Sequence, residues 1–352
     1  MKKFRKIYLD HNATTPVDPR VIEVMLPYFS EKFGNPSSSL HAYGWESEEA
    51  VEIAREQIAG SIGARTKEIY FTSGATEAIN LALMGISEAY QDKGNHVVTC
   101  STEHKAVLDT CNHLEKRGLE VTRLNVDNQG AINLKDLDNA INEKTILVCL
   151  MHANNETGVI HPLSEIAELV KKRDVLLMTD ATQSIGKIPF DVDKMGIDVA
   201  AFSSHKLYGP KGVGALYVRN RPKVSISPYL FGGGQERGLR PGTLNVPGIV
   251  GFGKAVELCA LEMHDDADRL KKLRDGIDHE LSVLANSQIN GKKSPRLPHM
   301  TNVSFRDIDE TKLIPSLKGL AVSRGSSCSS TTIKPSHVLK NMGLSDQLAL
   351  SS

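Results

Sequence analysis

The feature that most constrains the fold of this chain is a regular alternation of short apolar runs with longer amphipathic stretches. Apolar runs of strand length occur at residues 68–71, 96–99, 120–124, 145–150, 175–180 and 199–203. Helix-like stretches lie between them at 46–62, 103–116 and 163–172. Strands that alternate with helices build a largely parallel sheet with helices on both faces. We therefore predict an α/β fold that binds ligands at the carboxyl ends of its strands.

The last third of the chain departs from this alternation. Residues 232–234 and 240–243 interrupt it, and a long helical stretch rich in charged residues follows from 246 to about 284. A chain of 352 residues can hold a large domain and a smaller companion. We expect the boundary near the middle of the long helix. The predicted domains are a large one at 16–260 and a small α+β one that joins 1–15 to 261–352.

Charge and cysteine content narrow the class of protein. Lys plus Arg and Asp plus Glu both number 42, so no overall field favours nucleic acid or another polyanionic partner. The apolar run at 7–9 is too short for a signal peptide and no run approaches a membrane span, so we expect a cytoplasmic protein without membrane contact. The five cysteines are odd in number and form no CxxC pair, which supports neither a disulfide framework nor a zinc site.

A lysine and an aspartate follow two of the predicted strands. Lys206 ends the sequence SSHK after a buried run, and an amine that forms an imine with a cofactor aldehyde needs such a dry place. Asp180 ends another run, where a carboxylate could keep a pyridine nitrogen protonated. Alone, each residue is weak evidence for such a site, because most lysines are solvated and an aspartate at a strand end is more often a turn or cap residue. Together they favour a pyridoxal phosphate (PLP) site. Nearby polar residues that strengthen this interpretation are Ser203, His205 and Gln183.

Small residues begin the helix that follows the first predicted strand. Residues 72–77 (TSGATE) include Ala75 and Thr76, and free backbone N–H groups at such a helix start can meet a phosphate. An ordinary capped helix start explains these residues about equally well. The lysine motif moves the interpretation toward a phosphate site.

His104 and Asn155 lie just past two other strands at the same predicted edge. An imidazole at 104 could stack on a pyridine ring or move a proton, although a lone histidine is more often a surface or cap residue. The Asn155 amide, in NNETG at 154–158, could bind a cofactor oxygen or a substrate carboxylate. Turn formation is the alternative, and Gly158 supports it.

Cys328 differs from the other cysteines in its surroundings. It lies in RGSSCSSTT at 324–332, and a thiol on such a loop beside Arg324 is expected to be exposed and partly deprotonated, as a nucleophile requires. Taken alone, a flexible linker with an incidental cysteine is the better interpretation. The other four lie in strand-like or helical runs and are expected to be inert: Cys100, Cys111, Cys149 and Cys259.

Eight motifs run in order along the chain. They are 8–15 (YLDHNATT), 33–37 (FGNPS), 72–77 (TSGATE), 102–105 (TEHK), 154–158 (NNETG), 180–183 (DATQ), 203–206 (SSHK) and the loop around Cys328. Together they resemble the motifs of the cysteine desulfurases, in the class V branch of fold type I PLP enzymes. The cysteine loop looks most like that of the iron–sulfur assembly type. The resemblance implies a large domain with a mostly parallel, seven-stranded-type sheet flanked by helices, and a smaller α+β domain.

The resemblance also implies a role for each residue. Lys206 would carry the cofactor as an imine, Asp180 would pair with the pyridine nitrogen, and His104 would stack on the ring. Gln183 would lie near the phenolic oxygen. Asn155 and Asn35 would face the substrate. The implied phosphate contacts are Ala75, Thr76, Ser203, His205 and, from the second subunit of a homodimer, Thr243.

The implied reaction converts L-cysteine to L-alanine. Lys206 removes the Cα proton, and the Cys328 thiolate attacks the substrate sulfur and carries it as a persulfide. An iron–sulfur scaffold or another acceptor protein then takes the sulfur for cluster assembly or tRNA thiolation. No resident metal is implied, although Cys328 could act as a transient iron–sulfur ligand. Alternatives are a selenocysteine lyase or related class V aminotransferase, and an inactive scaffold that docks assembly partners.

The printed sequence ends at residues 348–352, where members of the family continue into further small-domain structure. That structure carries an arginine that holds the substrate carboxylate. We therefore expect a truncated sequence with a C-terminally incomplete small domain, which is the basis of the scaffold alternative.

Overall fold

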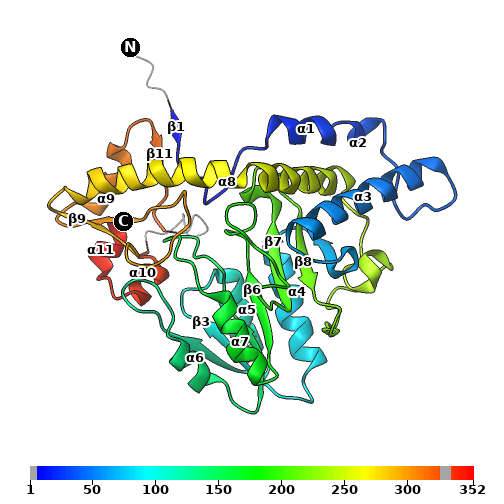
Figure 1. Cartoon of the computed structure of the whole chain (residues 1–352), viewed down its shortest axis with the longest axis horizontal. Helices are drawn as coiled ribbons and strands as arrows, with labels where there is room; N and C mark the ends of the chain where they lie inside the picture. Colours follow the sequence, from blue (N-terminus) through cyan, green and yellow to red (C-terminus); the bar gives the residue numbers. More distant parts are fainter. Residues whose placement is uncertain (1–5, 326–333) are drawn as a thin grey trace.

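The computed structural model describes residues 6–325 and 334–352, and within them seven strands form one central sheet (Figure 1). In chain order they are β2 (Ile69–Thr72), β3 (His96–Cys100), β4 (Glu120–Leu124), β5 (Thr145–Cys149), β6 (Leu176–Asp180), β7 (Val199–Ser203) and β8 (Gly214–Val218). Across the sheet the order is β2-β8-β7-β6-β5-β3-β4. The run from β7 to β4 is parallel, and β8 is antiparallel to both of its neighbours. The predicted mostly parallel α/β sheet is confirmed.

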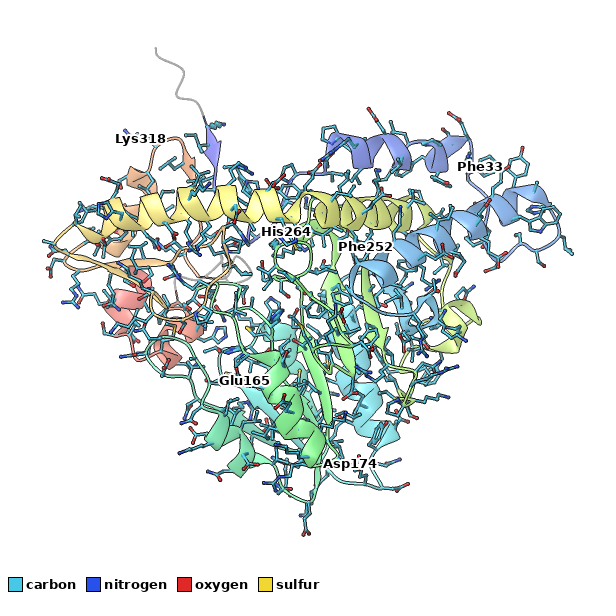
Figure 2. The ribbon with its side chains drawn as sticks, viewed as in Figure 1. Phe33, Glu165, Asp174, Phe252, His264 and Lys318 are labelled. Atoms are coloured by element: carbon cyan, nitrogen blue, oxygen red, sulfur yellow. The ribbon has the colours of Figure 1, made fainter. Side chains whose placement is uncertain are left out.

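Helices cover both faces of the sheet because buried residues along each strand alternate between two cores. In β3, Val97 packs in one core and Val98 in the other. Helices α4 (Ala75–Ala89) and α5 (Lys105–Glu115) close the core around Val97. The opposite core is closed by α3 (Ala42–Ser61), α6 (Leu134–Ala140), α7 (Leu163–Lys172) and the first half of α8 (Val246–Ser282). From α8 the fully buried Phe252 points toward the sheet (Figure 2).

Two short strand pairs lie near the second half of α8 (Figure 1). β1 (Ile7–Tyr8) pairs in parallel with β11 (Leu320–Ala321), and β9 (Ser287–Ile289) pairs antiparallel with β10 (Val303–Phe305). This arrangement agrees with the division into 16–260 and 1–15 with 261–352, which stays a prediction. The remaining elements are α1 (Pro19–Met25), α2 (Pro27–Ser30), η1 (Thr66–Glu68), η2 (Ser204–Lys206), η3 (Gln235–Gly238), α9 (Glu310–Ser316), α10 (His337–Asn341) and α11 (Asp346–Leu350).

The six predicted strands and three predicted helices lie within a few residues of their expected positions, but β8 was not predicted. Its first residue, Gly214, weakens the strand pattern. A Cβ at Gly214 would lie 2.6 Å from the Cα of Gly74, so the strand needs glycine where it passes the start of α4. Helix α3 begins earlier than predicted because the His41 imidazole caps it, accepting the Gly44 N–H at 3.3 Å. In the described ranges, every helix is too short or too polar to cross a membrane.

Candidate active site

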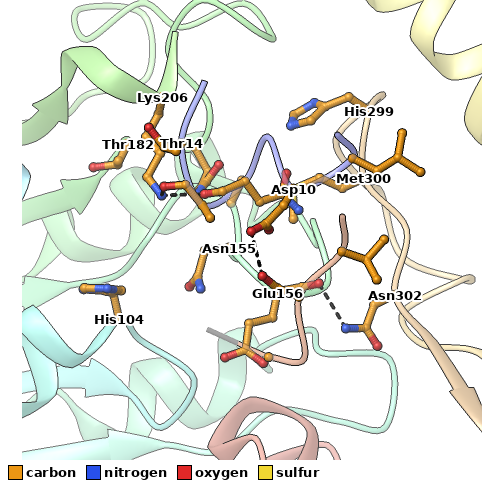
Figure 3. Close-up of a pocket in the computed structure, with 18 of the residues that line it drawn as sticks. Asp10, Thr14, His104, Asn155, Glu156, Thr182, Lys206, His299, Met300 and Asn302 are labelled. Atoms are coloured by element: carbon orange, nitrogen blue, oxygen red, sulfur yellow. Dashed lines mark hydrogen bonds between the residues drawn. The ribbon is translucent and has the colours of Figure 1, made fainter. Parts of the chain in front are cut away.

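A cavity of about 1050 Å³ lies at the carboxyl ends of β5, β6 and β7, where parallel sheets bind ligands (Figure 3). Figure 3 shows Lys206, Thr182 and His104 on one side, and His299 and Asn302 on the other. Nine residues that the sequence analysis selected line this one space: Ala75, Thr76, His104, Asn155, Asp180, Gln183, Ser203, His205 and Lys206.

Lys206 reaches the cavity from η2, the short turn that follows β7. Its amine donates hydrogen bonds to the backbone carbonyl oxygens of Asn12 and Ala13, the second at 2.7 Å. These acceptors belong to the N-terminal loop, which therefore lies directly against the amine. The contacts hold the nitrogen at one place inside the cavity.

Asp180 and His104 stand at the ends of two strands of the same sheet. The Asp180 carboxylate is only 8% exposed and accepts the Thr182 N–H at 2.9 Å. His104 caps α5: its Nδ1 accepts the Ala106 N–H at 3.1 Å, so a proton on the neutral ring resides at Nε2. Burial lowers the pKa of His104, an effect that Asp180 opposes and Lys206 reinforces. The imidazole is therefore neutral at pH 7.

The start of α4 and the residues around η2 also line the cavity. Gly74, the residue before α4, caps the helix with no side chain, so the N–H groups of its first turn remain available to an anion. His205 contacts the Thr14 hydroxyl through Nδ1 at 3.1 Å. Burial, with a smaller contribution from Lys206, lowers the pKa of His205 to about 4. This histidine is thus a neutral hydrogen-bonding group at pH 7.

The turn after β5 contains two adjacent asparagines whose side chains have different surroundings. Asn154 is buried, and its side-chain oxygen accepts the N–H groups of Glu156 and Thr157 at 2.9 and 3.0 Å. Its amide nitrogen donates to the Thr102 carbonyl at 3.1 Å. Asn154 therefore forms the turn, and Asn155 lines the cavity. The turn is thus made by Asn154, and the ligand role of Asn155 stays a prediction.

These residues fit PLP. An amine and a carboxylate are available to the aldehyde and the ring nitrogen, and the start of α4 is available to the phosphate. In the described residues, the buried Thr182 hydroxyl has no hydrogen-bond partner, so the cavity wall carries a polar group that a bound molecule could satisfy.

Some cavity residues have little or no signal in the sequence. Asn12, Ala13 and Thr14 belong to the motif at 8–15, to which no role was assigned. Lys211 lies soon after Lys206 in the chain, and its closeness to the lysine motif is a usable signal. A further pair, His299 and Asn302, comes from the segment after α8 and carries no motif at all.

Two of the described residues that were predicted for the site are not among those that line the cavity. Asn35 is exposed in the connection between α2 and α3, where its side chain accepts the Ser37 N–H at 3.0 Å. Thr243 is exposed before α8. Within this one chain neither reaches the cavity, which for Thr243 is the expected result of a role in a partner's site. Cys328 lies outside the described residues.

A strand-end lysine and aspartate, with a helix start in the same cavity, define a PLP-dependent enzyme of the parallel α/β type. Residues 7–348 match the family described as Aminotransferase class-V. A relative named "Cysteine desulfurase IscS", from Anaeromyxobacter sp. (strain Fw109-5), is 53% identical over 98% of this chain and 86% of its own length. Another of that name, from Pectobacterium carotovorum, is 49% identical with the same two coverages. The chain belongs to the cysteine desulfurases of the class V aminotransferase family, and its cofactor is PLP.

Solved structures agree with this assignment. "NIFS-LIKE PROTEIN" superposes with a TM-score of 0.90 at 41% identity, covering 98% of this chain and 92% of that one. "SspA in complex with cysteine" superposes with a TM-score of 0.88 at 38% identity, covering 98% and 96%. The resemblance in the sequence is therefore confirmed at the level of fold and family.

Proposed function

We propose that this cysteine desulfurase releases L-alanine from L-cysteine and transfers the sulfur to Cys328 as a persulfide. The observation that carries the proposal is the convergence of Lys206, Asp180 and the start of α4 on one cavity. A similar chain whose structure is described as a complex with cysteine supports the substrate.

The roles of the chain's own groups follow from their placement. PLP, when bound, supplies an aldehyde that joins amines and a protonated ring that withdraws electrons from Cα. The Asp180 carboxylate would hold the proton on the ring nitrogen, and the neutral His104 ring would pack against the PLP ring. The phosphate contacts are proposed to come from Ala75, Thr76, Ser203 and His205. Gln183 would donate toward the phenolic oxygen.

Lys206 moves the proton at Cα of the substrate. The Lys206 amine would take the Cα proton of the substrate and return it. Asn155 binds the substrate carboxylate through its amide. Asn35 is proposed to assist from a partner's connection between α2 and α3, because it lies away from the cavity of its own chain.

The atoms and electrons of the sulfur transfer balance with the Cys328 thiol and the substrate alone. Its thiolate sulfur bonds to the substrate sulfur, the Cβ–S bond breaks, and the bonding electrons and a proton go to Cβ to form the methyl group of alanine. One cysteine and one enzyme thiol thus yield one alanine and one enzyme persulfide. No external oxidant or reductant takes part.

We propose a homodimer, which brings Thr243 to the partner's phosphate site. Large apolar side chains are exposed near both Asn35 and Thr243 in the chain. Phe33 and Leu40, 64% and 92% exposed, flank Asn35, and Phe231, 87% exposed, precedes Thr243. Figure 2 shows Phe33 at the periphery of the molecule. Such a surface favours a second copy. Light scattering at micromolar concentration should give twice the chain mass, and a monomer that binds PLP fully would contradict the dimer.

The acceptor and the location stay predictions of the sequence. An iron–sulfur scaffold or another sulfur-acceptor protein, and a cytoplasmic setting, rest on the resemblance of the cysteine loop and on composition. The reaction itself is tested by incubating PLP-loaded protein with L-cysteine and a thiol reductant. Equal amounts of alanine and sulfide are expected. Sulfide without alanine, or neither product, would contradict the proposal.

A further inference from the structure

A second lysine lies behind the cavity wall. Lys187 lies at the end of the turn segment 182–187, which follows β6. It is partly buried, but it is not among the residues that line the cavity. Its amine donates a hydrogen bond to the side-chain oxygen of Gln183 at 3.2 Å. Gln183 is 4% exposed and does line the cavity. Lys187 therefore contacts the site through one named side chain.

The Gln183 carboxamide is held at both ends by partners of opposite type. Its nitrogen donates to the Asn12 carbonyl at 3.0 Å, and that carbonyl also accepts from Lys206. A carbonyl can only accept, and a lysine ammonium can only donate. Both partners independently require the amide nitrogen on the Asn12 side and the amide oxygen on the Lys187 side.

The backbone around Lys187 is fixed by close packing. Gly186 has φ of 70°, and a Cβ there would lie 2.9 Å from the Cβ of Cys259 on α8. The turn is therefore pressed against α8, and the lysine side chain emerges from a defined position.

We propose that Lys187 is a positioning residue that fixes the Gln183 carboxamide, so that its nitrogen rather than its oxygen faces Lys206 and the phenolic oxygen of PLP. This inference rests on the proposed function, which places Gln183 near that oxygen. Without Lys187 only the Asn12 carbonyl still opposes rotation of the Gln183 amide, so the rotated form becomes more populated. Its oxygen would then face an oxygen that carries negative charge, and the cofactor would lose a donor.

The charges around Lys187 set the conditions of the test. Burial, reinforced by Lys206, lowers the pKa of Lys187 to about 7, and Cys259 opposes this. The other titratable groups facing it are His11, His299 and His205, and its positive charge lowers the pKa of each of them. The ammonium form of Lys187 can only donate, whereas its neutral amine can also accept, so the positioning effect is strongest below pH 7.

The experiment compares four proteins loaded with PLP: the natural chain, Lys187→Met, Gln183→Ala and the double variant. We expect Lys187→Met to raise the PLP Kd about tenfold, the size of one lost hydrogen bond. We also expect the visible absorbance of bound PLP to pass from its acidic to its alkaline form at a midpoint pH about one unit higher. In the Gln183→Ala background the same substitution should change the PLP Kd by less than twofold. Lys172→Met, on an exposed residue of α7, is the matched control and should alter neither quantity.

Two outcomes overturn the inference. One is a folded Lys187→Met protein with unchanged PLP Kd and unchanged midpoint. The other is a full effect of Lys187→Met in the absence of the Gln183 side chain. If Lys187→Met does not fold, Lys187→Ala, whose side chain ends at Cβ and has no donor, is subject to the same criteria. Failure of the natural chain to take up PLP contradicts the proposed function instead, so the two failures are distinguishable.

Discussion

The Lys206 amine donates a hydrogen bond to the carbonyl oxygen of Asn12, 194 positions earlier in the chain. The N-terminal loop thus lies against the lysine that the proposed chemistry uses. Because the acceptor is a backbone carbonyl, the contact depends on the path of the loop and not on the Asn12 side chain. This explains how residues 8–15, to which the sequence analysis assigned no role, belong to the site.

Asp180→Asn should retain PLP but lose most of the reaction. The amide has no charge with which to keep the ring nitrogen protonated, while Lys206 is intact. We expect alanine formation to fall by about 10²–10⁴-fold, measured by amino-acid analysis after incubation with L-cysteine. Asp138→Asn, in an exposed ion pair with Arg173, is the control. An Asp180→Asn rate within tenfold of the natural chain would contradict the role.

Cys328→Ala should keep the bound cofactor and its visible absorbance but lose sulfide release by at least about 100-fold, because no thiolate remains to accept the sulfur. Cys111→Ala should behave as the natural chain does. Burial raises the pKa of Cys111 to about 12, so that thiol stays protonated and unreactive. Full sulfide release by Cys328→Ala would defeat the nucleophile assignment and favour a lyase-type reaction.

Part of this site follows from the sequence for a physical reason. Lys206, Asp180 and His104 each follow a strand of one parallel sheet, and parallel strands deliver their carboxyl ends to one edge. Lys187 and Gln183 are only four positions apart in the chain, yet the sequence pattern does not show which way the Gln183 amide is turned. The contact of Lys206 with Asn12 depends on the three-dimensional path of the N-terminal loop. The proposed role of Thr243 depends on a second chain, and His299 belongs to no motif that would have marked it.

His152 and His161 should make the protein less stable in acid. They are 4% and 1% exposed, adjacent through a backbone hydrogen bond of 2.9 Å, and burial lowers the pKa of each to about 4. The unfolded chain takes up these protons near pH 6.5, so the stability is fully present above that pH and is lost as pH falls toward 4. Each histidine accounts for about 2 kcal/mol between pH 7.5 and 5.

We therefore expect His161→Leu to reduce the loss of unfolding free energy between pH 7.5 and 5 by about 2 kcal/mol in urea titrations. His113→Leu, at an exposed position of α5, should leave the pH dependence unchanged. An identical pH dependence in His161→Leu and the natural chain would show that the buried imidazole takes up its proton without cost.

The buried ion pair between Arg55 and Glu236 should be a strong determinant of stability. Their side chains are 4% and 1% exposed and share two contacts of 2.8 Å, and Glu236 also accepts the Phe71 N–H at 2.6 Å. Removing one partner leaves a buried charge unpaired. We expect Glu236→Ala to lower the unfolding free energy by about 3–5 kcal/mol.

The exposed pair of Arg173 with Asp138 provides the comparison, since its side chains are 48% and 45% exposed. Asp138→Ala should cost less than about 1 kcal/mol. The double variant Arg55→Met with Glu236→Leu should be more stable than Glu236→Ala alone, because no unpaired charge remains. Equal losses for Asp138→Ala and Glu236→Ala in urea unfolding would contradict this account of the buried pair.

The amine of Lys206 should bind PLP covalently, which borohydride reduction of the PLP-loaded protein followed by peptide mass spectrometry tests. We expect the mass of the reduced cofactor on the peptide that contains Lys206, and its absence from that peptide in Lys206→Ala. Bound PLP with an unmodified Lys206 peptide would contradict this expectation.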